Sequence, residues 1–405
     1  MNTDPILRTH DLRARFEALD RYLLDHQTLW RPKPFTHLQL PWESLHPELA
    51  AWLRSRTLDE AEAAHNHPER LDAPAPFVQI ARQSSALSAL GNLPVTDLPS
   101  VSSRMAVDVP GRKWQQIEAF ASALVFKQTP EHWLDWCAGK GHLGRRLAYN
   151  GQTLTCLEFN PQLVEAGRTL SARLHICAEH IEQDVMAPDA SSQLRARHTP
   201  VALHACGDLH VQLMRLASDA DCQQMAIAPC CYNRITADSY QAMSTQGQAS
   251  ALRLSIDDLG LPLSETVTAG ARVRRQRDVS MARRLAFDVL QRELRGTDQY
   301  LPTPSLPVAW LEKPFAEYIQ DLAAMKDVAL TGERNWQSLE ALGWQRLAAV
   351  RNLELVRNLF RRPLELWLVL DRALYLCERG YNVRIGTFCD SPTTPRNVMI
   401  LAERI

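Results

Sequence analysis

The spacing of apolar residues changes along this chain, and each change predicts a different kind of secondary structure. In residues 1–110 the spacing is helical, because Leu12, Phe16, Leu19 and Leu23 fall on one face of a helix. Between residues 111 and 233, short apolar runs alternate with helical segments. Residues 234–362 return to mainly helical patterns. The chain therefore combines helical regions with one α/β region.

The alternation in residues 111–233 predicts a parallel sheet. Five strand-like runs, each bounded by helical or turn segments, are WLDWC, TLTCLEF, HIEQDV, PVALHAC and QQMAIAPCC. Strict alternation of strand and helix is typical of a doubly wound, Rossmann-like sheet. In such a sheet, ligands bind at the edge formed by the carboxyl ends of the strands.

The last 43 residues predict an amphipathic helix followed by two strands, YNVRIGTFCD and RNVMILAERI. The connection SPTTP is too short for a crossover, so the two strands pair antiparallel. We therefore expect a helical N-terminal domain (1–110), the first half of an α/β core (111–233), a mainly helical insertion (234–362), and the last helix and hairpin of the core (363–405).

Composition narrows the class of protein. The 405 residues carry a formal net charge of -1, which argues against a globally basic nucleic-acid binder and leaves a local basic patch open. The nine cysteines follow no regular spacing, so we expect free thiols in a reducing cytoplasm. No long apolar run or signal peptide is apparent, and we expect no membrane contact. Nothing in the sequence indicates an oligomeric state.

The segment LDWCAGKGHLG contains Gly-x-Gly-x-x-Gly at Gly139, Gly141 and Gly144. Glycines let the backbone approach a ligand closely between a strand and the following helix. The triplet alone fits a dinucleotide, S-adenosylmethionine, or a tight turn without a ligand. Glu158 ends the next strand, where both cofactors need an acid for their ribose hydroxyls, so Glu158 does not separate the two.

Three features favour S-adenosylmethionine over a dinucleotide. Asp135 precedes the glycines within the strand, Asp184 follows the third strand, and the chain ends in an antiparallel hairpin. Asp184 is suited to the adenine amine, although a loop acid or a helix cap is an alternative. We predict S-adenosylmethionine as the cofactor, with these residues at its site: Asp135, Cys137, Gly139, Gly141, Glu158, Asp184 and His204.

Several motifs together resemble a class I methyltransferase-domain family: LDWCAGKGHLGRRLA, ALHACGDL, IAPCCYN, LELWLVLDRALYLCERG and FCDSPTTPRNVMILA. The family includes vertebrate methyltransferase-like proteins and the glutathione S-transferase C-terminal-domain-containing protein. The chain is more distantly similar to tRNA acceptor-stem ribose 2'-O-methyltransferases, which implies RNA, and tRNA first, as the acceptor. The alternatives are a protein or small-molecule methyltransferase and a catalytically silent domain that binds the cofactor or a partner. The resemblance covers 111–233 and 363–405. The chain departs from it at Cys137, where many methyltransferases carry glycine, and lacks the cysteine- and histidine-rich clusters of the tRNA enzymes.

Candidate catalytic residues follow the fourth and fifth strands: His204, Cys206, Asp208, Cys230, Cys231, Tyr232 and Asn233. Methyl transfer is an in-line displacement, so positioning of the acceptor dominates catalysis. Tyr232 and Asn233 resemble groups that hold a planar acceptor, or else form a turn. Asp208 is alternatively a helix cap and His204 a core histidine.

The cysteines at these strand ends leave three interpretations open. Cys206 and Cys230 resemble the cysteine pair of enzymes that make 5-methylcytosine in RNA, in which one thiolate attacks the base. Buried packing is the first alternative. A metal site formed by Cys206, Cys230, Cys231 and His204 is the second, but the spacing is not that of a metal motif, so we expect no metal.

The segment from Arg272 to Arg295 contains eight arginines and three acids. Guanidinium groups bind phosphates bidentately, so a local patch could grip an RNA backbone on an otherwise neutral protein. A solvated helix face with intrachain ion pairs is the alternative. We assign the predicted RNA contact to four residues: Arg272, Arg274, Arg275 and Arg277.

Overall fold

A computed structural model describes residues 4–264 and 270–405. The chain forms two compact units. The sheet unit comprises the residues up to Leu24, Leu87–Leu263 and Arg362–Ile405, and the helical unit comprises Asp25–Ala86 and Ser264–Arg361. No described helix is long and apolar enough to cross a membrane.

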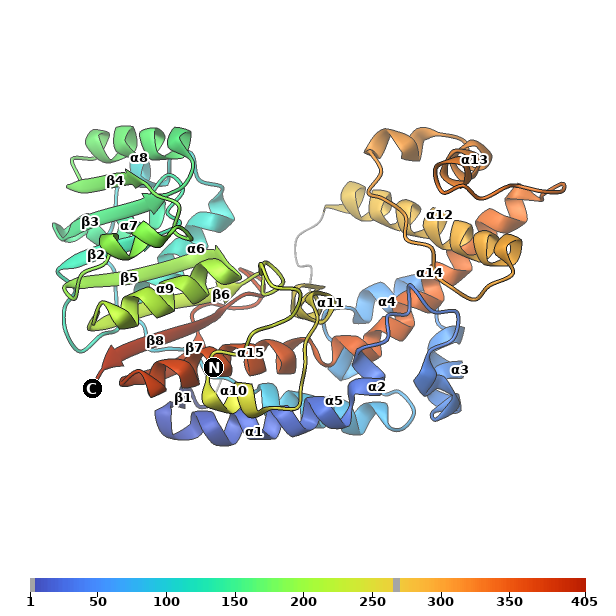
Figure 1. The fold of residues 1–405 in the computed structure, drawn as a ribbon, viewed down its shortest axis with the longest axis horizontal. Coiled ribbons are helices and arrows are strands. Elements are labelled where there is room, and N and C mark those ends of the chain that lie inside the picture. The colour runs from blue at the N-terminus through green and yellow to red at the C-terminus, as the bar shows by residue number, and fades with distance from the viewer. Residues whose placement is uncertain (1–3, 265–269) are drawn as a thin grey trace. The chain divides into compact units, whose positions relative to one another are not determined.

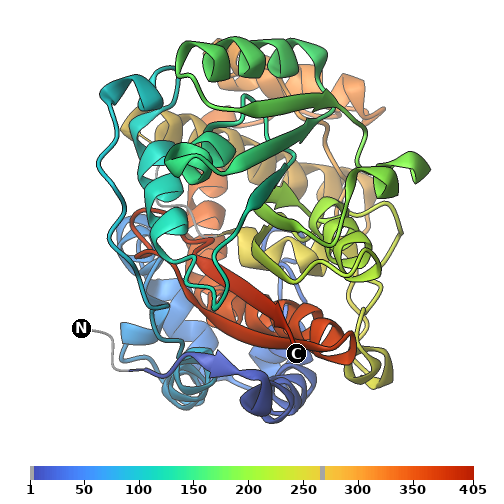
Figure 2. The ribbon, with the colours of Figure 1, turned by 90° about the vertical axis from the view of Figure 1, so that its left-hand side faces the viewer.

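The sheet unit is built on one eight-stranded sheet (Figures 1 and 2). Its strand order is β1-β7-β8-β6-β5-β2-β3-β4. The strands are β1 (Leu7–Arg8), β2 (His132–Trp136), β3 (Thr153–Glu158), β4 (Ala178–Glu182), β5 (His198–Cys206), β6 (Gln224–Cys230), β7 (Tyr381–Thr387) and β8 (Val398–Arg404).

The pairing confirms the predicted fold class. β4, β3, β2, β5 and β6 pair parallel with one another, whereas β8 lies antiparallel between β6 and β7. β6 is buried along its whole length, as expected of a strand covered on both faces. The two-residue strand β1 adds an antiparallel edge that the sequence pattern did not predict.

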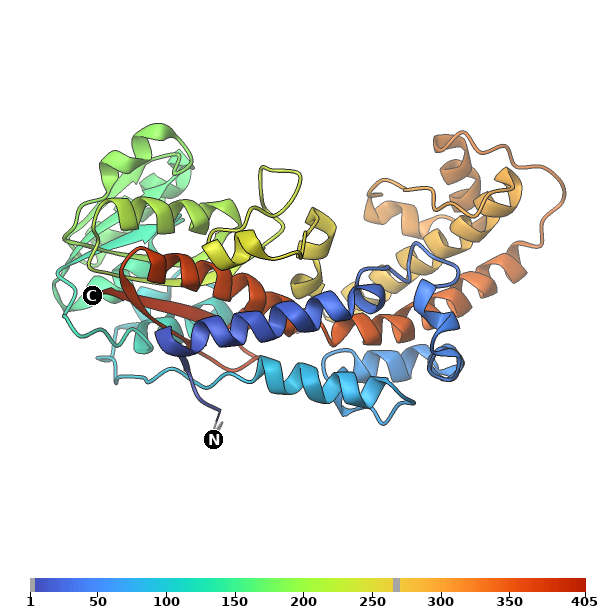
Figure 3. The same ribbon diagram turned by 60° about the horizontal axis from the view of Figure 1, so that its bottom comes forward.

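Among the described residues, eight helices belong mainly to the sheet unit, and α1 and α15 each have one terminal residue in the helical unit. They are α1 (Thr9–Asp25), α6 (Gly111–Ser122), α7 (His142–Leu147), α8 (Pro161–Arg173), α9 (Asp208–Asp219), α10 (Thr245–Ala249), α11 (Ile256–Leu259) and α15 (Arg361–Glu378). α1 runs beside α15 (Figure 3), where the Phe16 and Trp367 rings lie 5.1 Å apart. The predicted apolar face of α1 is buried.

The helical unit contains α2 (Gln27–Trp30), α3 (Pro47–Ser55), α4 (Leu58–Ala64), α5 (Phe77–Ser88, whose last two residues lie in the sheet unit), α12 (Ala271–Arg295), α13 (Phe315–Met325) and α14 (Trp336–Asn358). Short 3-10 helices occur in both units of the described chain: η1 (Pro41–Ser44), η2 (Pro68–Arg70) and η7 (Val308–Glu312) in the helical unit, and η3 (Ser103–Ala106), η4 (Ala148–Asn150), η5 (Pro188–Gln193) and most of η6 (Leu261–Ser264) in the sheet unit.

The two units differ from the four ranges expected from the sequence. The units of the structure divide after residues 24, 86, 263 and 361. The reason is that N-terminal and inserted segments pack together. Asn352 on α14, for example, donates its amide to the backbone oxygens of Arg56 and Thr57.

Candidate active site

The glycine loop follows β2 and leads into α7. Cys137, Gly139 and Gly141 have φ angles of 57°, 58° and 75°, all in the left-handed region. The Gly141 amide donates to the Ala138 oxygen at 2.8 Å and closes the turn. Cys137 therefore occupies a backbone position that favours glycine.

Asp135 fastens this loop to the sheet. Its side chain is buried, and its Oδ2 accepts a hydrogen bond from the Gly144 amide at 2.8 Å. Burial raises the pKa of Asp135 to about 7, against the opposing effects of the Gly144 amide and Arg145. Asp135 is not among the residues that line the neighbouring cleft, so its contribution to a ligand site is to position the loop.

Glu158 closes the loop from the adjacent strand. Its Oε2 accepts from the Gly139 amide at 2.9 Å, and its Oε1 accepts from the Asn160 amide at 3.0 Å. One carboxylate at the carboxyl end of β3 thus fixes the glycine loop and the start of α8.

A cleft of about 410 Å³ lies at the carboxyl ends of these strands. Its apolar wall and two carboxylates suit an adenosine group, which combines a flat ring with hydroxyl and amine donors. Phe159 is 70% exposed and follows Glu158 directly, a position that sequence reasoning missed. The cleft is lined by Cys137, Leu157, Glu158, Phe159, Gln183, Asp184, Val185 and Leu209.

Three of the predicted cofactor residues, Cys137, Glu158 and Asp184, therefore meet in one cleft. Asp184 also forms a turn, because its Oδ1 accepts from the Met186 amide at 2.9 Å. Its second oxygen makes no hydrogen bond among the described residues.

His204 lies at an irregularity of β5 and is exposed, so its interpretation as a core histidine is wrong. The reason is its φ of 72°, which turns the side chain out of the strand where the β5–β6 register shifts. Its Nε2 lies 2.7 Å from Gln116 Oε1. The Gln116 amide is oriented by its other end, because Nε2 donates to the Thr393 oxygen at 3.0 Å.

Cys206, Cys230 and Cys231 meet at the carboxyl ends of β5 and β6. Their sulfur atoms all lie within 4.8 Å of one another, with Cys206 and Cys230 at 3.6 Å. Hydrogen bonds from Cys206 and Cys230 lower the pKa of the Cys231 thiol, and Arg396 and Arg234 act in the same direction. Hydrogen bonding with Cys206 and Cys231 raises the pKa of Cys230. The three thiols thus form one cluster of mutually interacting groups at the ends of the two strands.

Two other predicted residues have structural roles. Asp208 is not the N-cap of α9, because Gly207 takes that position and the Asp208 side chain caps nothing. Its Oδ2 instead accepts from the Thr236 amide and hydroxyl at 2.7 and 2.5 Å. Tyr232 is completely buried. Its ring therefore cannot contact an acceptor at the carboxyl ends of β5 and β6, here called the rim, without a rearrangement. Asn233 is partly exposed, and its side-chain amide makes no hydrogen bond among the described residues.

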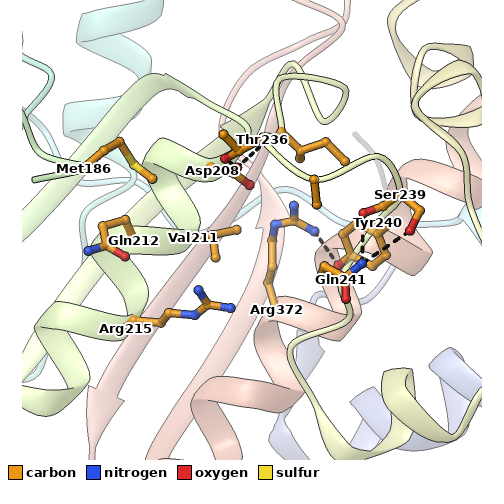
Figure 4. Close-up of a pocket in the computed structure, with 12 residues that line it drawn as sticks. Met186, Asp208, Val211, Gln212, Arg215, Thr236, Ser239, Tyr240, Gln241 and Arg372 are labelled. Atoms are coloured by element: carbon orange, nitrogen blue, oxygen red, sulfur yellow. Dashed lines mark hydrogen bonds between the residues drawn. The ribbon is translucent and has the colours of Figure 1, made fainter.

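A second cavity of about 260 Å³ lies between α9, α15 and the loop around residues 235–241 (Figure 4). Arg215 and Arg372 reach it from the two helices. Arg372 is fully buried, and its Nε donates to His210 at 2.7 Å. Its Nη2 has no hydrogen-bond partner, and no carboxylate of the described residues forms an ion pair with it. This buried cation is a feature that the sequence did not predict.

The basic segment lies on α12, and most of its arginines have partners within the helical unit. Arg277, predicted to contact RNA, lies within ion-pair distance of Glu62 and Asp278. Arg283, Arg284, Arg292 and Arg295 also contact groups of the same unit. The exposed arginines of α12 without such a contact among the described residues are Arg272, Arg274 and Arg275.

Replacing Asp135 by asparagine is expected to flatten the pH dependence of stability between about pH 4 and pH 7. The folded pKa of about 7 lies above the ordinary 3.8, so the stabilising contribution is full below about pH 4 and is lost as the pH rises through 7. Asparagine does not titrate. Urea unfolding at several pH values should therefore show that the variant loses less of its free energy of unfolding than wild type as the pH rises from about 4 to 7. Parallel stability curves would contradict this; exposed Asp97→Asn is the control.

The strand order, the glycine loop and the cleft together define an S-adenosylmethionine-dependent methyltransferase domain. Residues 112–238 match a protein-family model described as a methyltransferase domain. No curated protein matches the chain in sequence.

Two solved structures with bound S-adenosylhomocysteine are similar to this chain. The plantazolicin methyltransferase BpumL has a TM-score of 0.23 at 15% identity, over 42% of this chain and 59% of that one. Coclaurine N-methyltransferase has a TM-score of 0.22 at 13% identity, over 53% of this chain and 57% of that one. The chain thus spans less than two thirds of either neighbour, and likeness at these scores does not bear on its acceptor.

Proposed function

We propose that this chain transfers a methyl group from S-adenosylmethionine to RNA, with tRNA as the first acceptor to test. The observation that carries the methyl transfer is that the adenosine-like cleft adjoins the ends of β5 and β6. Leu209, three residues beyond the end of β5, lines the cleft, and the end of β5 is paired with the end of β6 at Cys206 and Cys230. A methyl donor in the cleft would therefore face an acceptor held at this rim.

Different residues of the cleft would contact different parts of the cofactor. Glu158 would accept hydrogen bonds from the ribose hydroxyls, and Phe159 with Val185 would cover the adenine ring. The free oxygen of Asp184 would accept from the adenine amine. When bound, S-adenosylmethionine supplies an electrophilic methyl group on a sulfonium. The protein then contributes mainly orientation.

The environment of His204 favours an acceptor that must lose a proton on methylation, such as a ribose hydroxyl. Gln116 Oε1 faces His204 Nε2, so Nε2 carries the proton of the neutral ring. Nδ1 then presents a lone pair, and it makes no hydrogen bond among the described residues. A lone pair at the rim can accept the hydroxyl proton as the methyl group is transferred, while the free amide of Asn233 can orient the acceptor.

RNA as the acceptor is supported by two independent features. Arg272, Arg274 and Arg275 are exposed at the start of α12 and available to phosphates. The motifs of the sheet unit also resemble, more distantly, tRNA ribose methyltransferases. The patch is smaller than the sequence suggested, because Arg277 and four further arginines have partners.

Radiolabelled S-adenosylmethionine tests the acceptor class. The purified protein is incubated with extract from cells lacking its gene, and label is counted in RNA, protein and small-molecule fractions. Label in RNA, located on the ribose by nucleoside analysis, is the expected result. Label confined to the protein or small-molecule fraction would overturn the proposal that RNA is the acceptor. It would still be consistent with methyltransferase activity.

We expect tRNA binding and its dependence on salt to weaken when three arginines of α12 are replaced together by glutamine. These are Arg272, Arg274 and Arg275. Loss of three phosphate contacts should reduce the slope of log affinity against log salt by about 2 to 3. Fluorescence titrations at several salt concentrations measure the slope. A charge-matched control replaces Arg13, Arg70 and Arg82, which are also exposed. Equal slopes for the two triple variants would remove this support for RNA.

A small anionic acceptor is a second candidate, favoured by the Arg372 cavity. A fully buried guanidinium without a carboxylate partner is costly, and an acidic ligand would supply the missing charge. Label in the small-molecule fraction, lost in Arg372→Met and weakened in Arg215→Gln, would favour this candidate over RNA.

A further inference from the structure

Three thiols from two neighbouring strands gather at the acceptor rim. Cys206 ends β5 and is paired in register with Cys230 at the end of β6, and Cys231 follows directly. Cys230 is buried, whereas Cys206 and Cys231 are partly exposed. The cluster therefore has a closed side in the sheet and an open side at the rim.

The backbone departs from regular strand geometry at both places that bring the thiols together. Consecutive side chains of a strand point to opposite faces, so Cys230 and Cys231 would normally diverge. Cys231 instead has a φ of 47°, which allows both thiols to approach Cys206. On β5, the left-handed His204 coincides with the register shift just before Cys206. Such conformations cost about 1–3 kcal/mol each for non-glycine residues, and they cluster at functional sites.

The separations match those of thiolates that share one metal ion. Zinc–sulfur bonds of about 2.3 Å in a tetrahedron place two sulfurs about 3.8 Å apart. Cys206 and Cys230 are 3.6 Å apart, and all three sulfurs lie within 4.8 Å. Arg234 and Arg396 add positive charge near Cys231, which would offset the net negative charge of three thiolates around a divalent ion.

We propose that Cys206, Cys230 and Cys231 together bind a Zn²⁺ ion at the carboxyl ends of β5 and β6. Thiolate ligands select zinc among the common divalent ions, and tetrahedral zinc takes a fourth ligand. Three protein ligands leave that fourth position to water or to a substrate atom arriving from the open side. A metal site at these cysteines was an open alternative in the sequence but was not expected, because no regular spacing relates the three residues. It goes beyond the proposed function, since it does not depend on which molecule accepts the methyl group.

Metal analysis of the full-length protein tests the site. The chain is purified without oxygen, with reductant and without chelator, and zinc is measured by inductively coupled plasma mass spectrometry. We expect about one zinc per chain, and a tenfold or greater loss in Cys206→Ser and in Cys231→Ser. Cys177→Ser and Cys389→Ser, outside the cluster, are matched controls that should keep the metal. Circular dichroism melts confirm that each variant is folded.

Cobalt substitution provides a second readout that does not require enzymatic activity. Co²⁺ added to metal-free protein should give intense tetrahedral d–d bands and a sulfur-to-cobalt charge-transfer band, both absent from folded Cys206→Ser and Cys231→Ser. Wild-type protein that takes up neither metal under reducing conditions would overturn the proposal. Uptake unchanged by either substitution, or a Cys206–Cys230 disulfide in metal-free protein that binds no zinc after reduction, would overturn it equally.

Discussion

Replacing Glu158 by glutamine is expected to weaken S-adenosylmethionine binding about 10- to 100-fold. Hydrogen bonds to a charged group contribute about 1.5–3 kcal/mol, and tenfold in affinity corresponds to about 1.4 kcal/mol. The carboxylate holds the amides of Gly139 and Asn160 at one edge of the cleft. Glutamine has one oxygen acceptor in place of two, so it cannot keep both amides and receive ribose hydroxyls as well.

Isothermal titration calorimetry of wild type and Glu158→Gln measures the effect. Glu165→Gln on α8 makes the same chemical change at a side chain that is 69% exposed, and it should bind like wild type. A thermal melt without cofactor separates lost ligand contacts from a collapsed loop. Wild-type affinity in a folded Glu158→Gln protein would show that the cleft does not hold the cofactor as assigned.

Local patterns predicted the parts of the site that depend on neighbouring residues. Apolar runs and glycine spacing within about 25 residues indicate three features. These are the strand ending at Trp136, the loop with Gly139 and Gly141, and Glu158 at the end of the next strand. The antiparallel pairing of β7 and β8 follows from the short connection between them. These features need little information from the rest of the fold.

The remaining features depend on contacts between distant segments. Tyr232 lies beside the rim residues in sequence, yet its ring packs into the core near Arg372 of α15. His204 leaves the core because of a strand irregularity that no apolar pattern marks. The cysteine cluster arises because β5 and β6 are neighbours and both change backbone direction at their ends. The strand order expected from the sequence brings these cysteines to one edge of the sheet, but their spacing does not show that the three sulfur atoms lie within 4.8 Å of one another.

Replacing Gly141 by alanine is expected to destabilise the sheet unit by about 2–5 kcal/mol and to abolish measurable cofactor binding. The φ of 75° costs a residue with a Cβ about 1–2 kcal/mol. An added Cβ would also lie 2.7 Å from His180 Cε1 and 3.1 Å from Cys156 Sγ. The His180 ring cannot easily yield, because it is buried and its Nε2 is hydrogen-bonded to Ser171 at 2.9 Å. Relief of such overpacking typically costs a further 1–3 kcal/mol.

Substitutions at two other glycines measure the free-energy cost of a positive φ separately from the cost of the Cβ clash. Gly139 and Gly151 also have positive φ angles, and an added Cβ would meet nothing within 4 Å at either position. Gly151→Ala should therefore lose only about 1–2 kcal/mol and bind the cofactor normally. Gly139→Ala should be as stable as Gly151→Ala but bind more weakly, because its methyl group would project into open space from the loop that Glu158 holds by the Gly139 amide. Chemical denaturation and calorimetry on the three variants measure both quantities. Equal stability of Gly141→Ala and Gly151→Ala would mean that His180 and Cys156 can move aside, and that the rigidity assigned to the loop is wrong.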